Sequence, residues 1–110
     1  MKELKNVGEY GDFYRVDGTA VIYVYSDSDR LGKAILEKVQ ELEKKYGNDR
    51  TNFALLQKDG ADDKFLTDYD LLKTPKLAMY RSGNPVGSVT QPASVESAVE
   101  EIEYLLQIFA

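Results

Sequence analysis

The stretch that decides the fold reads Ala20-Val21-Ile22-Tyr23-Val24-Tyr25 and is followed directly by Ser26-Asp27-Ser28-Asp29. Its first part is an unbroken run of apolar, β-branched and aromatic residues, which is typical of a strand buried on both faces of its sheet. The polar residues that follow are of the types that form turns and cap helices. The stretch therefore predicts a buried strand that leads directly into a helix.

An amphipathic helix is predicted from about Asp29 to Tyr46. Its apolar residues recur at spacings of three and four, while lysine and glutamate occupy the other face. These apolar residues are Leu31, Ile35, Val39, Leu42 and Tyr46. We expect Asp27, Ser28 or Asp29 to act as the N-cap, and Gly47 stands where a C-cap glycine belongs.

The rest of the chain predicts further strands and helices around this unit. The predicted elements are an edge strand over Glu3–Val7, a short helix over Gly8–Val16, a strand over Asn52–Gln57, a shorter helix over Asp62–Leu72, a hairpin of Lys76–Arg81 and Pro85–Val89, and a helix capped by Ser94. Strands separated by a full helix pair in parallel, whereas a hairpin adds antiparallel strands. We therefore expect an α/β fold, with a central mixed sheet of four to five strands and helices on both faces.

The composition describes one soluble domain over residues 1–110, because 43% hydrophobic residues suffice for a single core. The absence of cysteine and histidine excludes thiol nucleophiles, imidazole bases and the usual zinc ligands. A net charge of −5 disfavours binding to nucleic acid and to anionic membranes. No segment approaches the ~18 apolar residues of a membrane span, and the N-terminus does not resemble a signal peptide. We expect a cytoplasmic protein.

The order of the predicted elements, with Thr74-Pro75 before the hairpin, resembles that of the thioredoxin family from about Gly18 onward. The family's two redox cysteines align with Asp29 and Gly32, so that its C-x-x-C motif reads Asp29-Arg30-Leu31-Gly32 here. The resemblance implies a thioredoxin-like fold. Because a thiolate is the nucleophile of dithiol–disulfide exchange, it also implies a redox-inactive member.

Other positions of the family's site align with different residues. Its tryptophan before the motif aligns with Ser28, its buried aspartate with Tyr23, and a glycine that lines its substrate groove with Gln91. Its cis-proline aligns with Pro75, so the resemblance implies a cis bond between Thr74 and Pro75. The framework residues are retained while the reactive ones are replaced.

Our leading hypothesis is therefore a non-catalytic module that binds another protein or peptide, or serves a structural role, without a cofactor or metal. The expected binding groove consists of Asp27, Ser28, Thr74, Pro75, Thr90 and Gln91, next to the degenerate positions Asp29, Arg30, Leu31 and Gly32. As in complexes of thioredoxins, the backbone of Thr74 would pair with an extended peptide. An engineered variant of an active parent is disfavoured, because the differences reach well beyond the two cysteines.

The final helix offers a second candidate surface. Its core stripe is expected to consist of Val95, Ala98, Val99, Ile102, Leu106 and Phe109. Outside that stripe the helix is still apolar at Tyr104, Leu105 and Ile108. We expect Tyr104, Leu105, Ile108 and Phe109 to contact a partner or a second copy of the chain, unless the helix end packs across the sheet or frays.

The rival hypothesis is a cofactor-free enzyme or a divalent-metal site in the Asp27–Asp29 loop. Carboxylates two residues apart, with hydroxyls beside them, are suitable ligands for Ca²⁺ or Mg²⁺. No further oxygen ligands with a recognisable loop spacing follow, and helix capping accounts for the same residues. Both carboxylates lie in a polar loop rather than in an apolar pocket, which does not favour acid–base catalysis.

A second acidic stretch reads either as a solvated face or as a surface for a basic partner. It consists of Asp59, Asp62, Asp63, Asp68 and Asp70. The tyrosines are expected in the core and sheet, because the strand with Tyr23 and Tyr25 lacks the interleaved lysine and arginine that a platform for stacking nucleobases would need.

Overall fold

The computed structural model describes residues 1–110. The elements in chain order are β1 Lys2–Glu3, α1 Val7–Tyr14, β2 Thr19–Tyr25, α2 Arg30–Tyr46, β3 Thr51–Gln57, α3 Asp63–Asp68, β4 Lys76–Arg81, β5 Asn84–Thr90 and α4 Val95–Phe109. The strands form a five-stranded sheet in the order β1-β3-β2-β4-β5. β1 and β2 each pair with β3 in parallel, whereas β4 pairs antiparallel with β2 and β5. No helix is both long and apolar enough to cross a bilayer.

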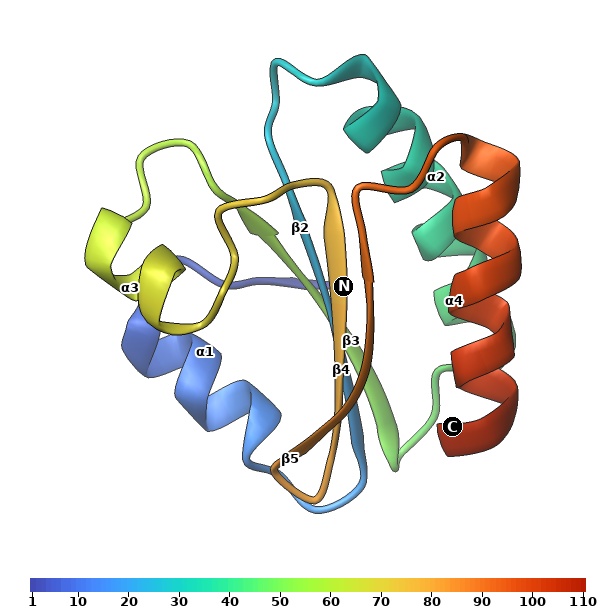
Figure 1. The fold of residues 1–110 in the computed structure, drawn as a ribbon. Coiled ribbons are helices and arrows are strands. Elements are labelled where there is room, and N and C mark those ends of the chain that lie inside the picture. The colour runs from blue at the N-terminus through green and yellow to red at the C-terminus, as the bar shows by residue number, and fades with distance from the viewer.

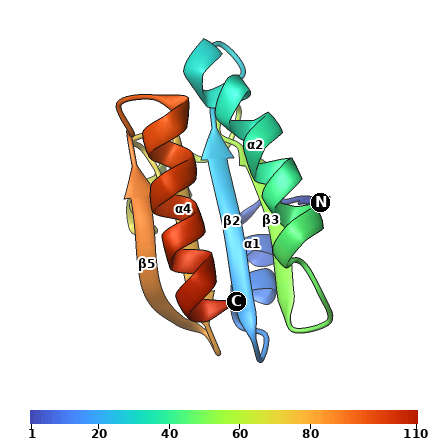
Figure 2. The same cartoon turned by 90° about the vertical axis from the view of Figure 1, so that its right-hand side faces the viewer.

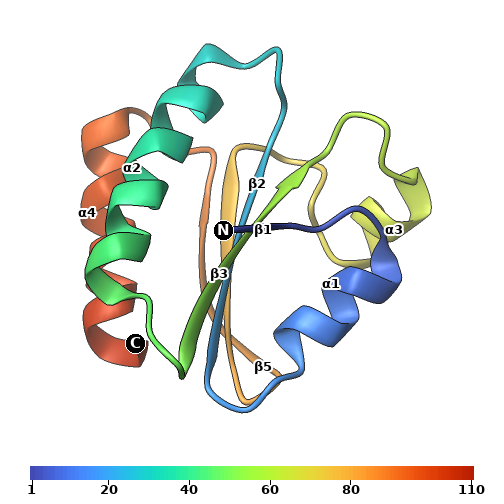
Figure 3. The ribbon, with the colours of Figure 1, turned by 180° about the vertical axis from the view of Figure 1, so that it is seen from behind.

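The sheet is covered on both faces. α1 and α3 lie on one side and α2 and α4 on the other (Figure 1), and the view from behind shows the same three layers (Figure 3). This arrangement confirms the predicted α/β fold with a mixed sheet. The central strand β2 accounts for the two covered faces, because its side chains alternate between a core on each side of the sheet. Ala20, Ile22 and Val24 pack on the α1 side, while Val21 and Tyr23 pack on the α2 side.

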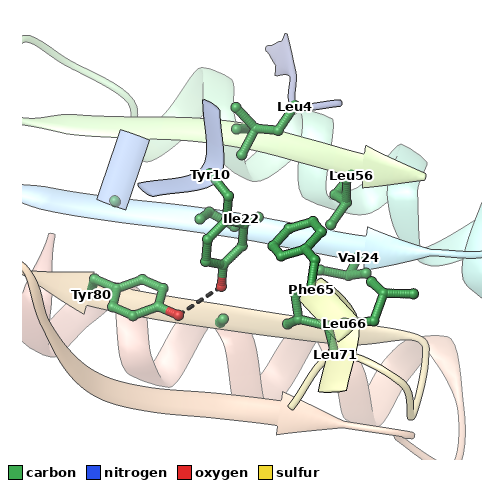
Figure 4. Close-up of a cluster of buried hydrophobic side chains, with 12 residues drawn as sticks. Leu4, Tyr10, Ile22, Val24, Leu56, Phe65, Leu66, Leu71 and Tyr80 are labelled. Atoms are coloured by element: carbon green, nitrogen blue, oxygen red, sulfur yellow. Dashed lines mark hydrogen bonds between the residues drawn. The ribbon is translucent and has the colours of Figure 1, made fainter. Parts of the chain in front are cut away.

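The core on the α1 side is rich in aromatic residues. Tyr10 of α1 is fully buried and its hydroxyl lies 2.6 Å from that of Tyr80 on β4. Figure 4 shows this hydrogen bond among the buried side chains of α1, α3 and the sheet. The Tyr10 ring also packs edge-on against Phe65, and the half-buried Tyr14 and Tyr69 surround it. The expectation that tyrosines serve the core is confirmed here.

The hairpin follows its predicted position. Ser82 and Gly83 both have positive φ, of 50° and 82°, as a type I′ turn requires at its two central residues. The turn joins β4 to β5. Compared with the predicted range, β5 begins one residue earlier and ends one residue later. A register shift between Met79 and Tyr80 marks a β-bulge in this pair.

The N-terminal predictions were wrong in their boundaries. The edge strand covers only Lys2–Glu3, because Asn6 ends the extended segment as the N-cap of α1. The Glu9 N–H donates to the Asn6 side chain, and the Lys5 N–H donates to the Glu9 carboxylate. The predicted helix over Asp62–Leu72 is also shorter. It ends at Asp68, because Asp70 adopts a left-handed conformation with φ of 57°.

Candidate functional site

The β2–α2 junction is held by its carboxylates. Asp29 is the N-cap of α2, and its Oδ1 accepts a hydrogen bond of 3.1 Å from the Leu31 N–H. The Asp27 carboxylate lies 3.7 Å from the Lys33 ammonium in an exposed ion pair. The capping role predicted for this loop is confirmed, with Asp29 as the capping residue. No group of three or more acidic side chains is arranged to hold a metal ion.

Asp59 fixes the same loop from the next strand. The Ser26 hydroxyl lies 3.0 Å from both Asp59 carboxylate oxygens, and the Asp27 N–H donates to Asp59 Oδ2 at 3.1 Å. Sequence reasoning missed this contact and placed Asp59 in an acidic stretch that was either a solvated face or a surface for a basic partner. The contact could have been predicted from the strand pairing. Because β3 pairs with β2 in parallel, the residues that follow Tyr25 and Gln57 must lie close together.

Tyr23 occupies the interior beneath the degenerate motif. Its hydroxyl donates a 2.7 Å hydrogen bond to the carbonyl of Gly32, and its ring stacks on that of Tyr25 with centroids 5.9 Å apart. Burial, and secondarily the nearby Asp29 carboxylate, raise the pKa of Tyr23 well above its ordinary value. The phenol is therefore neutral at physiological pH and does not serve as a proton acceptor.

The two positions that align with the redox cysteines face each other without a thiol. Gly32 is buried, and a Cβ added there would lie 3.1 Å from Asp29 Oδ2. The carboxylate that caps the helix thus fills the space above Gly32. A side chain added at Gly32 would press on the Asp29 carboxylate, which would have to shift by a few tenths of an ångström.

The Thr74–Pro75 bond is cis, as the resemblance implies. Pro75 is buried and lines the same closed apolar pocket as Tyr23. Its carbonyl accepts a 2.8 Å hydrogen bond from the N–H of Gln91, which has a left-handed φ of 46°. Thr74 itself is half-buried, and neither its N–H nor its C=O has a hydrogen-bond partner within the chain.

The expected groove is brought together only in part. The β2–α2 loop, the segment before β4 and the β5–α4 connection all lie at one end of the sheet (Figure 1). Gln91 contacts Pro75 directly, and the exposed Thr90 precedes it. Asp27, however, lines an open cleft of about 450 Å³ together with Asp59 and residues of the β1 segment, on the other side of β2.

The apolar residues at the end of α4 divide into an exposed pair and a partly buried pair. Tyr104 is 64% exposed and Ile108 is 53% exposed, whereas Leu105 and Phe109 pack partly buried against the core on the α2 side. Leu105 lies outside the core stripe but packs against the core, as the alternative of a helix end across the sheet implies, because Gly87 of β5 leaves room for its side chain. A Cβ at Gly87 would lie 2.7 Å from Leu105 Cδ2.

The helix terminus is also anchored. Arg81 Nη1 donates to the carbonyl of Phe109 at 2.8 Å, and the Thr19 hydroxyl donates to the same carbonyl. These bonds satisfy a C-terminal carbonyl that the helix itself leaves free. The end of α4 therefore packs across the sheet.

The second acidic stretch consists largely of residues with local partners. Asp62 caps α3 by accepting from the Phe65 N–H. The Asp68 carboxylate lies 3.0 Å from the Lys64 ammonium, and that of Asp70 lies 3.4 Å from the ammonium of Lys76. These roles are structural ones.

Comparisons with known proteins agree with this architecture. No family model matches the chain, and no curated protein matches it in sequence. A thioredoxin of Plasmodium falciparum is similar in structure, with a TM-score of 0.83 at 14% identity over 100% of both chains. The thioredoxin of Fasciola hepatica gives a TM-score of 0.83 at 13% identity, again over 100% of both chains. The chain has the thioredoxin fold.

Mitochondrial thioredoxin 3 from Saccharomyces cerevisiae extends the comparison, with a TM-score of 0.82 at 14% identity over 99% of this chain and 95% of that chain. At such identities the likeness establishes the thioredoxin fold. Since this chain contains no cysteine, thiol chemistry of the thioredoxin type has no nucleophile in it.

Proposed function

We propose that this chain binds an extended peptide segment of another protein at Thr74, without any dithiol–disulfide step. The observation that carries the proposal is the pair of unpartnered backbone groups on this half-buried residue. A backbone N–H and a C=O that have no partner within the chain are available to bond to another molecule. An extended peptide that runs alongside Thr74 supplies one acceptor and one donor, as in strand addition.

The surroundings of Thr74 support this proposal because they are already ordered. The bond from Gln91 to Pro75 holds the following segment, and the bonds from Ser26 and Asp27 to Asp59 hold the β2–α2 loop. A surface that is fixed before binding loses little conformational entropy when a partner arrives. This favours recognition of a peptide backbone by a surface of defined shape.

The chemistry of the neighbouring side chains is consistent with binding alone. Asp29 is engaged as a helix cap, and Tyr23 is a buried phenol that donates to Gly32. The proposal places no reaction on either group, because the first holds the helix start and the second is committed as a donor within the chain. The proposed role therefore includes no bond-making step.

A peptide-display selection against the purified chain tests the proposal. We expect the selected peptides to lose roughly tenfold or more in affinity for Leu31→Asp, because Leu31 belongs to the degenerate motif and is half-buried in the first turn of α2. The matched control is Val16→Asp, at an exposed apolar residue beyond the opposite end of β2. Failure to select any peptide, or equal losses in both variants, would contradict the proposal.

A further inference from the structure

A second surface lies on the outer side of β5, at the border of the sheet. The geometry points to the outer edge of β5, with the groove between β5 and α4, as a binding site for an extended basic segment of a partner protein. This inference is independent of the function proposed at Thr74. Figure 2 shows β5 at the border of the sheet with α4 alongside it.

The hydrogen-bonding pattern leaves part of this edge open. Because the Gln91 N–H bonds to the Pro75 carbonyl and the period of a strand is two, Val89 and Gly87 direct their backbone groups toward β4. The backbone groups of Ser88 and Thr90 therefore face away from the sheet. They form a row of donors and acceptors that an added strand can use.

The two halves of β5 differ in their protection. The first half carries Pro85, and it lies next to the β-bulge at Met79/Tyr80. Proline and bulges are two of the devices by which natural proteins block edge pairing. The second half, Ser88–Thr90, has neither device. The opposite border strand, β1, has only two residues, so β5 is the long exposed edge of this sheet.

A groove of about 330 Å³ runs beside the open half of β5. It is lined by Ser88, Val89, Glu100, Glu101, Tyr104 and Leu105. Leu105 lies over Gly87 and gives an apolar surface, while Tyr104 is 64% exposed and forms part of the α4 side. An exposed aromatic side chain next to an open edge is suited to pack on the aliphatic stem of a lysine or arginine.

The negative charge of the groove favours a basic partner. Glu100 and Glu101 are exposed and take part in no ion pair, whereas their neighbour Glu103 is paired with Lys45 at 2.7 Å. A strand that carries lysine or arginine on its α4-facing side would bring cations to both unpaired carboxylates. A second copy of this chain would instead bring like charges together, so a basic partner fits better than self-association.

The test uses the intact chain and a capped peptide of alternating threonine and lysine, equal in length to β5. We expect fluorescence anisotropy to show binding that a peptide of alternating threonine and glutamate does not show. Two further probes carry N-methyl groups either on all lysines or on all threonines. In an added strand, the backbone N–H groups of either the lysines or the threonines face β5, and those of the other residues face solvent. We therefore expect one methylated probe to lose binding and the other to retain it. Equal binding of both would overturn strand addition.

Charge variants separate this site from general attraction to an acidic protein. Glu100→Gln/Glu101→Gln is expected to weaken peptide binding roughly tenfold, while Glu37→Gln/Glu41→Gln on α2 removes the same charge and leaves binding unchanged. Equal weakening in the two double variants would overturn the site.

Two controls complete the design. Leu31→Asp should not affect this peptide, which distinguishes failure here from failure at Thr74. A concentration-dependent dimer in sedimentation that Ser88→Pro abolishes would show a second copy on the edge and overturn the basic partner.

Discussion

The β2–α2 junction and the segment before β4 lie at the same end of the sheet, yet their hydrogen-bonding capacity differs. At the junction, Asp29 caps α2, Tyr23 donates to Gly32, and Asp59 accepts from the loop. In the segment before β4, Thr74 has two backbone groups without partners. The first region is closed by bonds within the chain, and the second keeps its capacity for a bond to another molecule.

This difference separates two properties of a binding site. A reaction centre needs a group whose bonding or protonation changes, and the thiols that play this part in dithiol–disulfide exchange are absent from the closed region. A docking site needs unfilled hydrogen-bonding capacity on a rigid support, and Thr74 has it. The comparison predicts that variants in the closed region change stability, whereas the Thr74 segment matters for binding.

The largest effect is expected from the closed region. Tyr23→Ala removes a fully buried aromatic ring from the core on the α2 side and should lower the free energy of unfolding by ~3–5 kcal/mol. Tyr23→Phe keeps the ring but removes the hydrogen bond to Gly32, so the loss should be only ~1 kcal/mol. Urea unfolding measures both, and equal losses would show that the ring does not pack as described.

The buried tyrosines should also make stability sensitive to alkaline pH. Burial raises the pKa of Tyr23 and Tyr10 above the ordinary value, so the folded chain retains protons that the unfolded chain releases. Their contribution is complete below the unfolded pKa of about 10 and is lost as the pH rises above it.

Urea unfolding at increasing pH measures this loss. Each of the two phenols contributes a slope of at most ~1.4 kcal/mol per pH unit. Tyr23→Phe should therefore make the slope shallower. An unchanged slope in that variant would contradict the burial of the Tyr23 hydroxyl.

A smaller effect is expected at the helix cap. Asp29→Ala removes the acceptor for the Leu31 N–H and should cost ~1 kcal/mol of stability. Asp27→Ala, two residues earlier, removes only an exposed ion pair and should change stability by less than ~0.5 kcal/mol. Thermal unfolding of the two variants compares them directly, and a larger loss for Asp27→Ala would reverse our assignment of the cap.

The smallest effect is expected at Thr74. Its side chain makes no hydrogen bond, and the proposed contacts use only its backbone. Thr74→Ala should therefore change stability by less than ~0.5 kcal/mol and leave the affinity for a selected peptide unchanged. Isothermal titration calorimetry gives the affinity, and a large loss would mean that the side chain takes part in recognition.

Local signals were enough to predict much of this molecule. The buried run before Ser26, the N-cap of α2, the hairpin turn at Ser82-Gly83 and the cap at Ser94 each depend on residues close in sequence. Their conformations follow from capping and turn preferences that act over a few residues. The fold class could therefore be predicted from the order of these units.

The missed features depend on contacts between distant segments. Asp59 holds a loop more than thirty residues away, and Leu105 is partly buried because Gly87 on another strand leaves it room. Neither contact leaves a periodic pattern in its own segment. The unpartnered backbone of Thr74 is likewise a property of how β4 pairs with its neighbours, which no local pattern encodes.

Hydrogen exchange at the Thr74 amide tests the central claim most directly. In the free chain this N–H has no acceptor and should exchange rapidly compared with the amides of β4. At saturation with a selected peptide, we predict that its exchange slows by roughly tenfold or more, because the peptide carbonyl becomes its acceptor. An unchanged exchange rate at Thr74 in the saturated complex would contradict docking at this residue.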